Sequence, residues 1–341
     1  MSLTIGLTYD LRNDYLEKGF DEQTVAEFDS HETIDALDAT IRSLGYRTDR
    51  IGSAWSLCRR LSDGQRWDLV FNIAEGLFGR SREAQVPAIL ELHQAPYTFS
   101  DPLVCAATLD KAVAKRLVRD AGLLTAGFAV AREPGDLAGV ELAYPLFVKP
   151  LCEGTGKGID ERSRIDDAEQ LKRRVRELLL RYHQPVLIEE FLPGREVTVG
   201  VLGTGRDARV LGTMEIELRD PSQGGIYSYD SKERCEQLVR YFPMEKGPLR
   251  ERVETLALQS YLALECRDAG RVDIRLDRSG QPCFMEVNPL PGLHPSHSDL
   301  PMIATQEGMP YAELIGSIIT SALARNRSSD ATAVRKRSAA S

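Results

Sequence analysis

The stretches that decide the fold are Arg271-Val-Asp-Ile-Arg-Leu-Asp277 and Phe284-Met-Glu-Val-Asn-Pro-Leu-Pro-Gly292. Arg271 and Asp273 are two positions apart in a β-type segment, so their side chains leave the same face of a strand. Glu286 and Asn288 have the same relation in the second stretch, and the residues between the stretches have turn composition. If the two strands pair, three oxygen-bearing side chains and one guanidinium meet on one patch.

Such a patch is typical of a site for Mg²⁺ and an anion. Mg²⁺ usually takes one or two carboxylates and leaves its remaining positions to water and phosphate oxygens. An arginine beside the carboxylates suits an oxyanion or a phosphate. The alternative is an ordinary amphipathic hairpin with a charged solvent face. The tail Asn288-Pro-Leu-Pro-Gly292 argues against this alternative, because a Pro/Gly turn directly after the candidate ligands is typical of a built site.

A second signal is a lysine followed by a glycine-rich loop. Lys149 ends an apolar strand, and Cys152-Glu-Gly-Thr-Gly-Lys-Gly158 follows it. The three glycines of this loop expose backbone N–H groups and permit positive φ, which is how a loop closes over phosphates. A P-loop is excluded, because that motif needs a glycine and a Ser or Thr where this chain has Leu151 and Gly158.

Together with Asp110-Lys111, these motifs resemble the ATP-grasp superfamily, and specifically its D-alanine–D-alanine ligase branch. The resemblance covers about residues 5–314 and includes Val70-Phe-Asn72, Ala95-Pro-Tyr97, Val148-Lys-Pro150, Gly194-Arg-Glu196, Tyr229 with Lys232, and Ser296-His-Ser298. It implies an α/β (α+β) ATP-grasp fold with three domains. These are a Rossmann-like open α/β domain at 1–100 and two α+β subdomains at 101–195 and 196–324 that sandwich ATP. We expect residues 325–341 to form a disordered tail, because they lack an apolar pattern.

The activity that the resemblance implies is ATP-dependent carboxylate–amine ligation. A substrate carboxylate attacks the γ-phosphate of ATP, so that an acyl phosphate forms and ADP leaves. The amine of the second substrate then displaces phosphate and gives an amide of the dipeptide type. The implied cofactors are ATP and two Mg²⁺ ions, with Mn²⁺ as an alternative. Catalysis in such transfers is mostly positioning and charge neutralisation.

The resemblance also assigns roles by position. The residues expected to bind ATP are Lys111, Lys149, Glu153, Gly154, Gly156, Lys157, Glu189, Glu190, Phe191, Leu192 and Glu196. The expected metal ligands are Asp273, Glu286 and Asn288. The residues expected to act at the reacting groups are Glu27, Thr155, Lys232, Glu233, Arg271 and Gly292. The residues expected to face the amino-acid substrates are Glu75, Ser298 and Asp299. Among these, Glu27 resembles a group that holds the ammonium of the first substrate, and Lys232 and Ser298 resemble groups that hold the carboxylate of the second.

The chain departs from the family at positions that face the expected amino-acid site. Glu75 replaces a histidine, Glu233 a tyrosine and Asp299 a hydrophobic residue, and Gly79-Arg-Ser-Arg82 replaces an acidic loop. One hypothesis is that a substrate carries more positive charge or more amine donors than D-alanine. The other is that some of these carboxylates only reshape the pocket by pairing with Arg80, Arg82 or Lys157.

The departures favour a ligase with altered amino-acid substrates over a D-alanine–D-alanine ligase of cell-wall synthesis. A third hypothesis, from a different class, is a nucleotide-binding regulatory protein without turnover. Retention of Arg271, Asp273, Glu286 and Asn288 together argues against that class.

The composition excludes several other classes. The 341 residues carry a net charge of −8, which disfavours nucleic acid as a partner because phosphate binding needs a basic surface. Six scattered cysteines predict free thiols. No apolar run is long enough to span a membrane, and the first residues lack the pattern of a signal peptide. We therefore expect a cytoplasmic protein that acts on small amino-acid-like substrates, and the resemblance adds a homodimer as an option.

Apolar periodicity predicts the main elements. Helices are expected at 30–44, 101–122, 167–182, 249–264 and 311–324, and strands at 3–8, 69–72, 146–150 and 186–190. The charged connection 10–27 is long enough to predict a loop that covers the substrate site.

Overall fold

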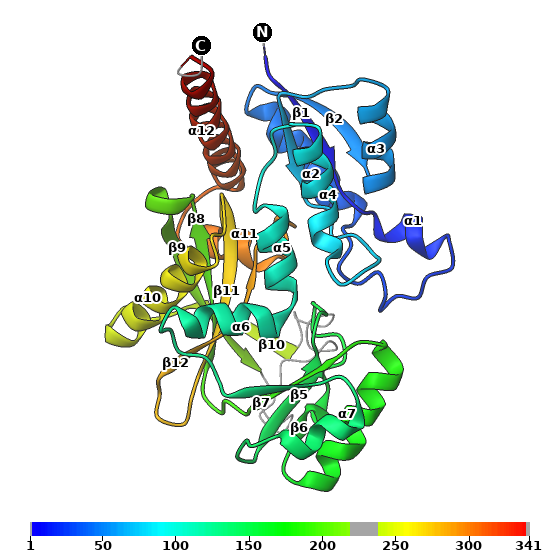
Figure 1. The fold of residues 1–341 in the computed structure, drawn as a ribbon. Coiled ribbons are helices and arrows are strands. Elements are labelled where there is room, and N and C mark those ends of the chain that lie inside the picture. Colours follow the sequence, from blue (N-terminus) through cyan, green and yellow to red (C-terminus); the bar gives the residue numbers. More distant parts are fainter. Residues whose placement is uncertain (1, 219–237, 339–341) are drawn as a thin grey trace.

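The computed structural model describes residues 2–218 and 238–338, with side chains described as far as Asn326. Three β-sheets follow one another through the molecule (Figure 1). The strands are β1 Thr4–Thr8, β2 Arg47–Gly52, β3 Leu69–Asn72, β4 Phe128–Ala131, β5 Leu146–Pro150, β6 Arg164–Ile165, β7 Val186–Glu190, β8 Glu196–Leu202, β9 Arg209–Leu218, β10 Val239–Pro243, β11 Ala269–Leu276 and β12 Pro282–Asn288. The α-helices are α1 Arg12–Leu16, α2 His31–Ser43, α3 Ala54–Ser62, α4 Gln85–Leu92, α5 Pro102–Leu109, α6 Lys111–Asp120, α7 Ala168–Tyr182, α10 Pro248–Ala263, α11 Asp299–Gln306 and α12 Tyr311–Ser338.

The N-terminal sheet is parallel, in the order β2-β1-β3, and forms an open α/β unit with α2, α3 and α4. Every residue of β3 is buried, as expected for a parallel strand that reads as an apolar run. The segment after α4 covers the outer edge of β3, where Val70 donates its backbone N–H to Pro96 at 2.7 Å and accepts one from Thr98 at 2.9 Å.

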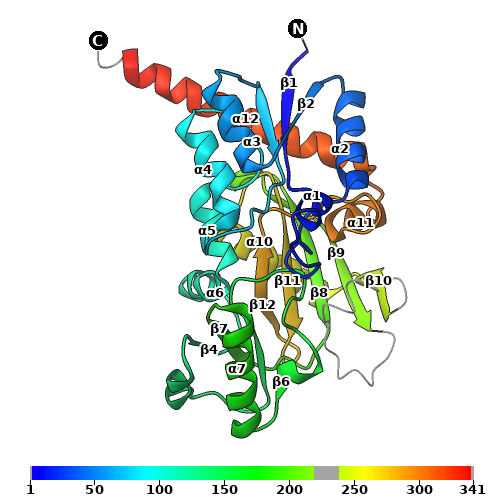
Figure 2. The same ribbon diagram turned by 90° about the vertical axis from the view of Figure 1, so that its right-hand side faces the viewer.

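The N-terminal sheet shares a hydrophobic core with the C-terminal helices. Ile5 and Phe71 belong to the same buried cluster as Leu300 of α11 and Ile318 of α12. Figure 2 shows α12 crossing behind the N-terminal unit, where it packs against α2. The first and last parts of the chain are therefore stabilised together, because burial of apolar surface is the main favourable term in folding.

The largest sheet is antiparallel, in the order β10-β9-β8-β11-β12. Its β11–β12 hairpin is the one predicted from the sequence, with Asp273 opposite Glu286 and Arg271 opposite Asn288. The register shifts after Asp273, so Met285 is an extra residue in β12. A β-bulge of this kind re-aims side chains, and bulges are common beside active sites.

A smaller antiparallel sheet, β4-β7-β5-β6, lies below the hairpin and is covered by α7 (Figure 1). Because β5 and β7 are neighbours, Phe147 stands opposite Glu189 and Lys149 opposite Leu187. The glycine-rich loop leaves the end of β5 and returns toward the N-terminal unit. The smaller sheet and the largest sheet face each other, and the glycine loop begins between them.

The segment 101–122 is helical as predicted, but Asp110 divides it into two helices, α5 and α6. The Asp110 carboxylate accepts the backbone N–H of Ala112 at 3.1 Å and of Val113 at 3.0 Å, which makes it the N-cap of α6. N-cap side chains satisfy N–H groups that a helix start leaves without partners. The cap places Lys111 at the first position of α6.

The expected end of the last helix also differs. α12 continues past Ala324 to Ser338, whereas the sequence predicted a disordered tail from Arg325 on. Arg325 forms a salt bridge with Asp268 at 2.9 Å and donates to the carbonyl of Tyr97 at 2.9 Å. Polar contacts such as these do not affect the apolar periodicity of the sequence. The helix predicted from that periodicity therefore ended too early, at residue 324. Over the described ranges, no helix combines the length and apolarity needed to cross a membrane.

Candidate active site

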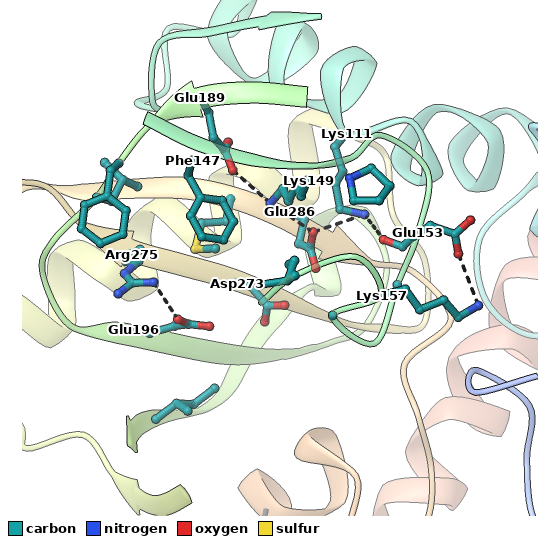
Figure 3. A pocket seen from close by; sticks show the side chains of 18 of the residues that line it. Lys111, Phe147, Lys149, Glu153, Lys157, Glu189, Glu196, Asp273, Arg275 and Glu286 are labelled. Atoms are coloured by element: carbon teal, nitrogen blue, oxygen red, sulfur yellow. Dashed lines mark hydrogen bonds and ion pairs between the residues drawn. The ribbon is translucent and has the colours of Figure 1, made fainter. Parts of the chain in front are cut away.

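Two adjoining cavities lie at the centre of the molecule. The first, between the smaller and the largest sheet, is lined by every residue that the sequence predicted to bind ATP. Figure 3 labels several of these residues. The second reaches from there to the N-terminal unit and is lined by Glu27, Glu75, Thr155, Gly292 and Ser298, among others. Six residues line both cavities: Lys111, Glu153, Gly154, Arg271, Glu286 and Asp299.

A buried carboxylate beside the first cavity pairs with two lysines, of which Lys149 lines the cavity. Glu189 Oε1 is 3.0 Å from Lys149 Nζ, and Glu189 Oε2 is 2.9 Å from Lys115 Nζ. Burial alone would raise the pKa of Glu189, but the two ammonium groups outweigh it and lower that pKa to about 2. The carboxylate is therefore charged and fixes Lys149 toward the cavity, as Figure 3 shows.

Lys111 adds a second ammonium group close to that of Lys149 in this cavity. Lys111 Nζ donates to the carbonyl of Glu153 at 2.5 Å and lies 3.4 Å from Glu286 Oε2. Lys149 Nζ lies 3.9 Å from the same Glu286 oxygen. Two ammonium groups thus converge beside one carboxylate of the hairpin, which is a suitable arrangement for binding phosphate oxygens.

The glycine-rich loop is folded back on itself and fastened to the N-terminal unit. Thr155 has a φ of 52° and Gly156 one of 72°, so two consecutive residues adopt the left-handed conformation. The Glu27 carboxylate accepts the Gly154 N–H at 2.6 Å and pairs with Arg82 at 2.8 Å and with Lys157 at 3.3 Å. Burial would raise the pKa of Glu27, but Arg82 and Lys157 outweigh it and the pKa falls below its ordinary value.

The far end of the first cavity is an apolar slot with polar edges. Its apolar lining is Phe147, Ile159, Phe191, Leu192, Val197, Ile216 and Met285. Arg275 lies 5.5 Å from the ring centroid of Phe191 and pairs with Glu196 at 3.2 Å. The bulge in β12 lets two consecutive residues, Met285 and Glu286, line the same cavity. A flat aromatic base suits this slot, and Glu196 lines the same cavity.

The predicted metal ligands come together on the hairpin. Asn288 Nδ2 lies 3.3 Å from Asp273 Oδ2, and Thr198 Oγ1 donates to Asp273 Oδ1 at 2.7 Å. Within residues 2–218 and 238–338, no group of three or more His, Cys, Asp and Glu side chains is arranged to hold a metal ion. The predicted set contains only two carboxylates, Asp273 and Glu286, and its third member is an amide.

Arg271 is held between two carboxylates. It pairs with Asp273 at 2.9 Å and with Asp299 at 2.7 Å. Burial would lower the pKa of the guanidinium, but Asp273 and Asp299 outweigh it and raise that pKa. Asp299, one of the departures from the family, therefore has a partner within the site.

The second cavity contains carboxylates that have no such partner. Within the described part of the chain, Glu75 and Glu83 form no hydrogen bond and no salt bridge. Burial, then the charges of Glu83 and Glu27, raise the pKa of Glu75 well above its ordinary value. Burial raises the pKa of Glu83 to about 7, despite Arg82 beside it.

The alternative that Arg80, Arg82 or Lys157 neutralises Glu75 is not supported by these contacts. Arg80 pairs with Asp110, and Arg82 and Lys157 both pair with Glu27. Lys232 and Glu233, which the resemblance placed at the reacting groups, lie outside the described residues.

Sequence reasoning missed three residues of this site. Lys115 was not predicted, although it follows Lys111 by four positions and so lies on the same face of one helix. Arg82 and Glu83 were not assigned to the site, because the Gly79-Arg-Ser-Arg82 segment was known only as a departure from an acidic loop. Their role depends on the fold, which brings them against Glu27 and the glycine loop.

The arrangement of these sheets around the first cavity is that of an ATP-grasp enzyme. Comparison with known proteins agrees with this class. A family model described as "D-ala D-ala ligase C-terminus" matches residues 117–320. The chain resembles the uncharacterized protein y4sG of Sinorhizobium fredii, with 35% identity over 74% of this chain and 73% of that protein. It also resembles the D-alanine–D-alanine ligase of Bordetella avium, with 36% identity over 76% of this chain and 80% of that one.

Solved structures show the same fold. The D-alanine–D-alanine ligase from Bacillus anthracis in complex with ATP has a TM-score of 0.72 at 22% identity, over 96% of this chain and 100% of that one. The VanG D-Ala:D-Ser ligase from Enterococcus faecalis has a TM-score of 0.73 at 22% identity, over 94% of this chain and 100% of that one. The chain belongs to the D-alanine–D-alanine ligase family. It is an ATP-dependent ligase that forms an amide bond.

Proposed function

We propose that this ligase joins the carboxylate of one amino-acid-like substrate to the amine of another, and that the pair differs from two D-alanine molecules. The observation that supports the proposal is the pair of adjoining cavities that share Lys111, Arg271 and Glu286. ATP in the first cavity would present its γ-phosphate to a carboxylate in the second. Such proximity can supply most of the rate enhancement of a transfer reaction.

In this proposal Lys111, Lys149 and the glycine loop bind the phosphates of ATP. Adenine occupies the apolar slot beside Phe191, and Glu196 accepts the ribose hydroxyls. Both oxygens of Glu189 are bound to lysines. We therefore propose that Glu189 positions Lys149 beside the adenine slot.

The donor set of the hairpin fits Mg²⁺, because two carboxylates and an amide oxygen from facing strands are hard oxygen ligands. Asp273, Glu286 and Asn288 would hold the metal, with Mn²⁺ as a substitute. A bound metal would neutralise charge on the phosphates of ATP.

The second half of the reaction needs stabilisation of an oxyanion at the acyl carbon. We assign this to Arg271 and to the backbone N–H of Gly292, which both line the second cavity. Loss of one such donor typically lowers a rate by ~10²–10³. Ser298, whose hydroxyl accepts the N–H of His294 at 2.9 Å, is placed to bind the carboxylate of the amine substrate.

The test is phosphate release from Mg-ATP with D- and L-amino acids, singly and in pairs, followed by mass spectrometry of the products. We expect an amide product that requires two amino-acid-like substrates, and loss of it in Lys149→Gln. Lys172→Gln, which removes an exposed lysine paired only with Glu169, serves as the matched control. Absence of amine-dependent phosphate release would contradict ligation, and D-alanyl-D-alanine as the preferred product would contradict the altered substrates. Light scattering on the same protein tests the homodimer.

A further inference from the structure

We propose that Glu75 and Glu83 form a binding site for a side-chain ammonium group, so that the substrate whose carboxylate is activated is a diamino acid. The inference rests on the proposed function and names the substrate class of the same site. It goes beyond the departures read from the sequence, because Glu83 becomes significant only through its position in the fold.

By resemblance, Glu27 holds the ammonium of the first substrate. Both of its oxygens are already occupied. Oε1 accepts the Gly154 N–H at 2.6 Å, and Oε2 pairs with Arg82 at 2.8 Å and Lys157 at 3.3 Å. Arg82 is buried, and its second contact is the carbonyl of Cys152 at 2.8 Å. Glu27 therefore fastens the glycine loop and has little capacity left for a substrate cation.

Glu83 is only 9% exposed and lines the second cavity. Its carboxylate has no hydrogen bond and no salt bridge among the described residues. A buried polar group without a partner costs folding free energy, so such groups are rare unless a function retains them. Glu75 lines the same cavity, and its carboxylate likewise forms no hydrogen bond or salt bridge with the residues that the structure describes.

The two carboxylates of Glu75 and Glu83 require positive charge from a bound substrate. Arg82, the cation that acts most strongly on Glu83, is already paired with Glu27. One ammonium group, as in an ordinary amino acid, would balance only one of the two carboxylates. A substrate with two ammonium groups balances both, and ammonium groups are the natural donors to acceptor-only oxygens.

The surroundings of Glu83 indicate which of the two substrates carries the second ammonium group. Besides Arg82 and Glu27, the charged groups that influence Glu83 most are Lys111 and Glu286. Both line the nucleotide cavity as well as the second one. The ammonium site thus lies on the side where the γ-phosphate is expected, which is the side of the carboxylate that is phosphorylated.

The experiment isolates that substrate by using hydroxylamine as the amine. The acyl phosphate then reacts with hydroxylamine, phosphate leaves, and a coloured iron complex reports the hydroxamate. Purified protein with Mg-ATP is given D- and L-lysine, ornithine and 2,4-diaminobutyrate, and in parallel norleucine and D-alanine. We expect at least one diamino acid to exceed norleucine, its neutral counterpart, by about 100-fold in kcat/KM, because a site built for a polar group rejects analogues that lack it.

Variants Glu75→Gln and Glu83→Gln should reduce that preference to below about 10-fold, while the KM for ATP stays within about 2-fold. Glu169→Gln, a surface carboxylate paired with Lys172, should change neither value. Hydroxamate formed from neutral amino acids with no preference for diamino acids would overturn the inference and leave the proposed ligase intact. No hydroxamate and no phosphate release with any amino acid would overturn both. The comparison of lysine with norleucine uses the unaltered protein, so it decides the inference even if a variant fails to fold.

Discussion

At the scale of single residues, the site depends on charges that are buried and satisfied by one another. Lys115 is fully buried, and its ammonium group contacts Glu189 at 2.9 Å, Thr125 at 3.0 Å and the carbonyl of Phe284 at 3.3 Å. It joins α6 to the strand β12 and, through Glu189, to the strand that carries Lys149. Lys115 therefore contributes to the site without lining either cavity.

Substitution of Lys115 tests this arrangement. Lys115→Met should lower the free energy of unfolding by about 3 kcal/mol, because the buried Glu189 carboxylate would keep only one of its two ammonium partners, Lys149. Urea denaturation measures the change. The matched control is Lys172→Met, which removes a lysine whose side chain is 63% exposed and should cost less than about 1 kcal/mol. A loss at Lys115 as small as that of the control would contradict the proposed role of the pair.

Glu83 predicts a stability that depends on pH. Its folded pKa of about 7 lies above its ordinary value of 4.5, so between these values the folded protein binds more protons than the unfolded one. The free energy of unfolding therefore falls as pH rises from about 4.5 to 7. Glu83→Gln should be more stable than the unaltered protein by about 2–3 kcal/mol at pH 8, and nearly equal to it at pH 4.5. Thermal unfolding of both proteins at the two pH values measures this, and equal stability at pH 8 would contradict it.

At the scale of elements, the hairpin and its flanking strands could be predicted from the sequence, because alternation along a strand places Arg271 with Asp273 and Glu286 with Asn288. The bulge at Met285 could not, since it depends on how β12 packs against its neighbours. The break between α5 and α6 was present in the sequence as Asp110, a strong N-cap residue. It was overlooked because the apolar stripe continues across it.

The glycine loop yields a prediction at the same scale. A Cβ at position 154 would collide with Glu27 Oε1, the atom that accepts the Gly154 N–H. Gly154→Ala should separate the loop from the N-terminal unit and raise the KM for ATP by about 10-fold, the equivalent of one lost hydrogen bond to a charged group. Gly139→Ala is the matched control, because a Cβ there meets no atom within 4 Å. Steady-state kinetics compare the two, and an unchanged KM in Gly154→Ala would show that this contact does not support the loop.

At the scale of the whole molecule, the parts that escaped prediction are those formed between distant segments. The pairing of Glu27 with Arg82 and Lys157 joins three stretches of chain, and no local pattern specifies which cation meets which carboxylate. The same holds for α12, whose last described contacts are polar and reach across to the N-terminal unit. Apolar periodicity reports the faces of elements, and it carries no information about which polar groups meet between them.

Asp268 is the clearest example of such a junction, because one fully buried carboxylate receives four donors from three other segments of the chain. Its oxygens accept the Phe99 N–H at 2.8 Å, the Ser321 hydroxyl at 2.8 Å, the Thr204 hydroxyl at 3.1 Å and the Arg325 guanidinium at 2.9 Å. The end of the N-terminal unit, the start of β11, the turn after β8 and the helix α12 are therefore fixed at one point.

The junction predicts strong coupling between Asp268 and Arg325. Asp268→Ala should cost about 3–5 kcal/mol, because it leaves Arg325 and three further donors without their acceptor. Arg325→Met should cost less, since the remaining donors still satisfy the carboxylate in part. The double variant should cost about as much as Asp268→Ala alone, so that the two losses fail to add by more than about 1 kcal/mol. Urea denaturation of the four proteins measures the cycle, with Arg240→Met, which removes an exposed partner of Glu217, as the control. Strict additivity would mean that α12 and the start of β11 are stabilised independently, and that the chain's two ends are joined only by their apolar core.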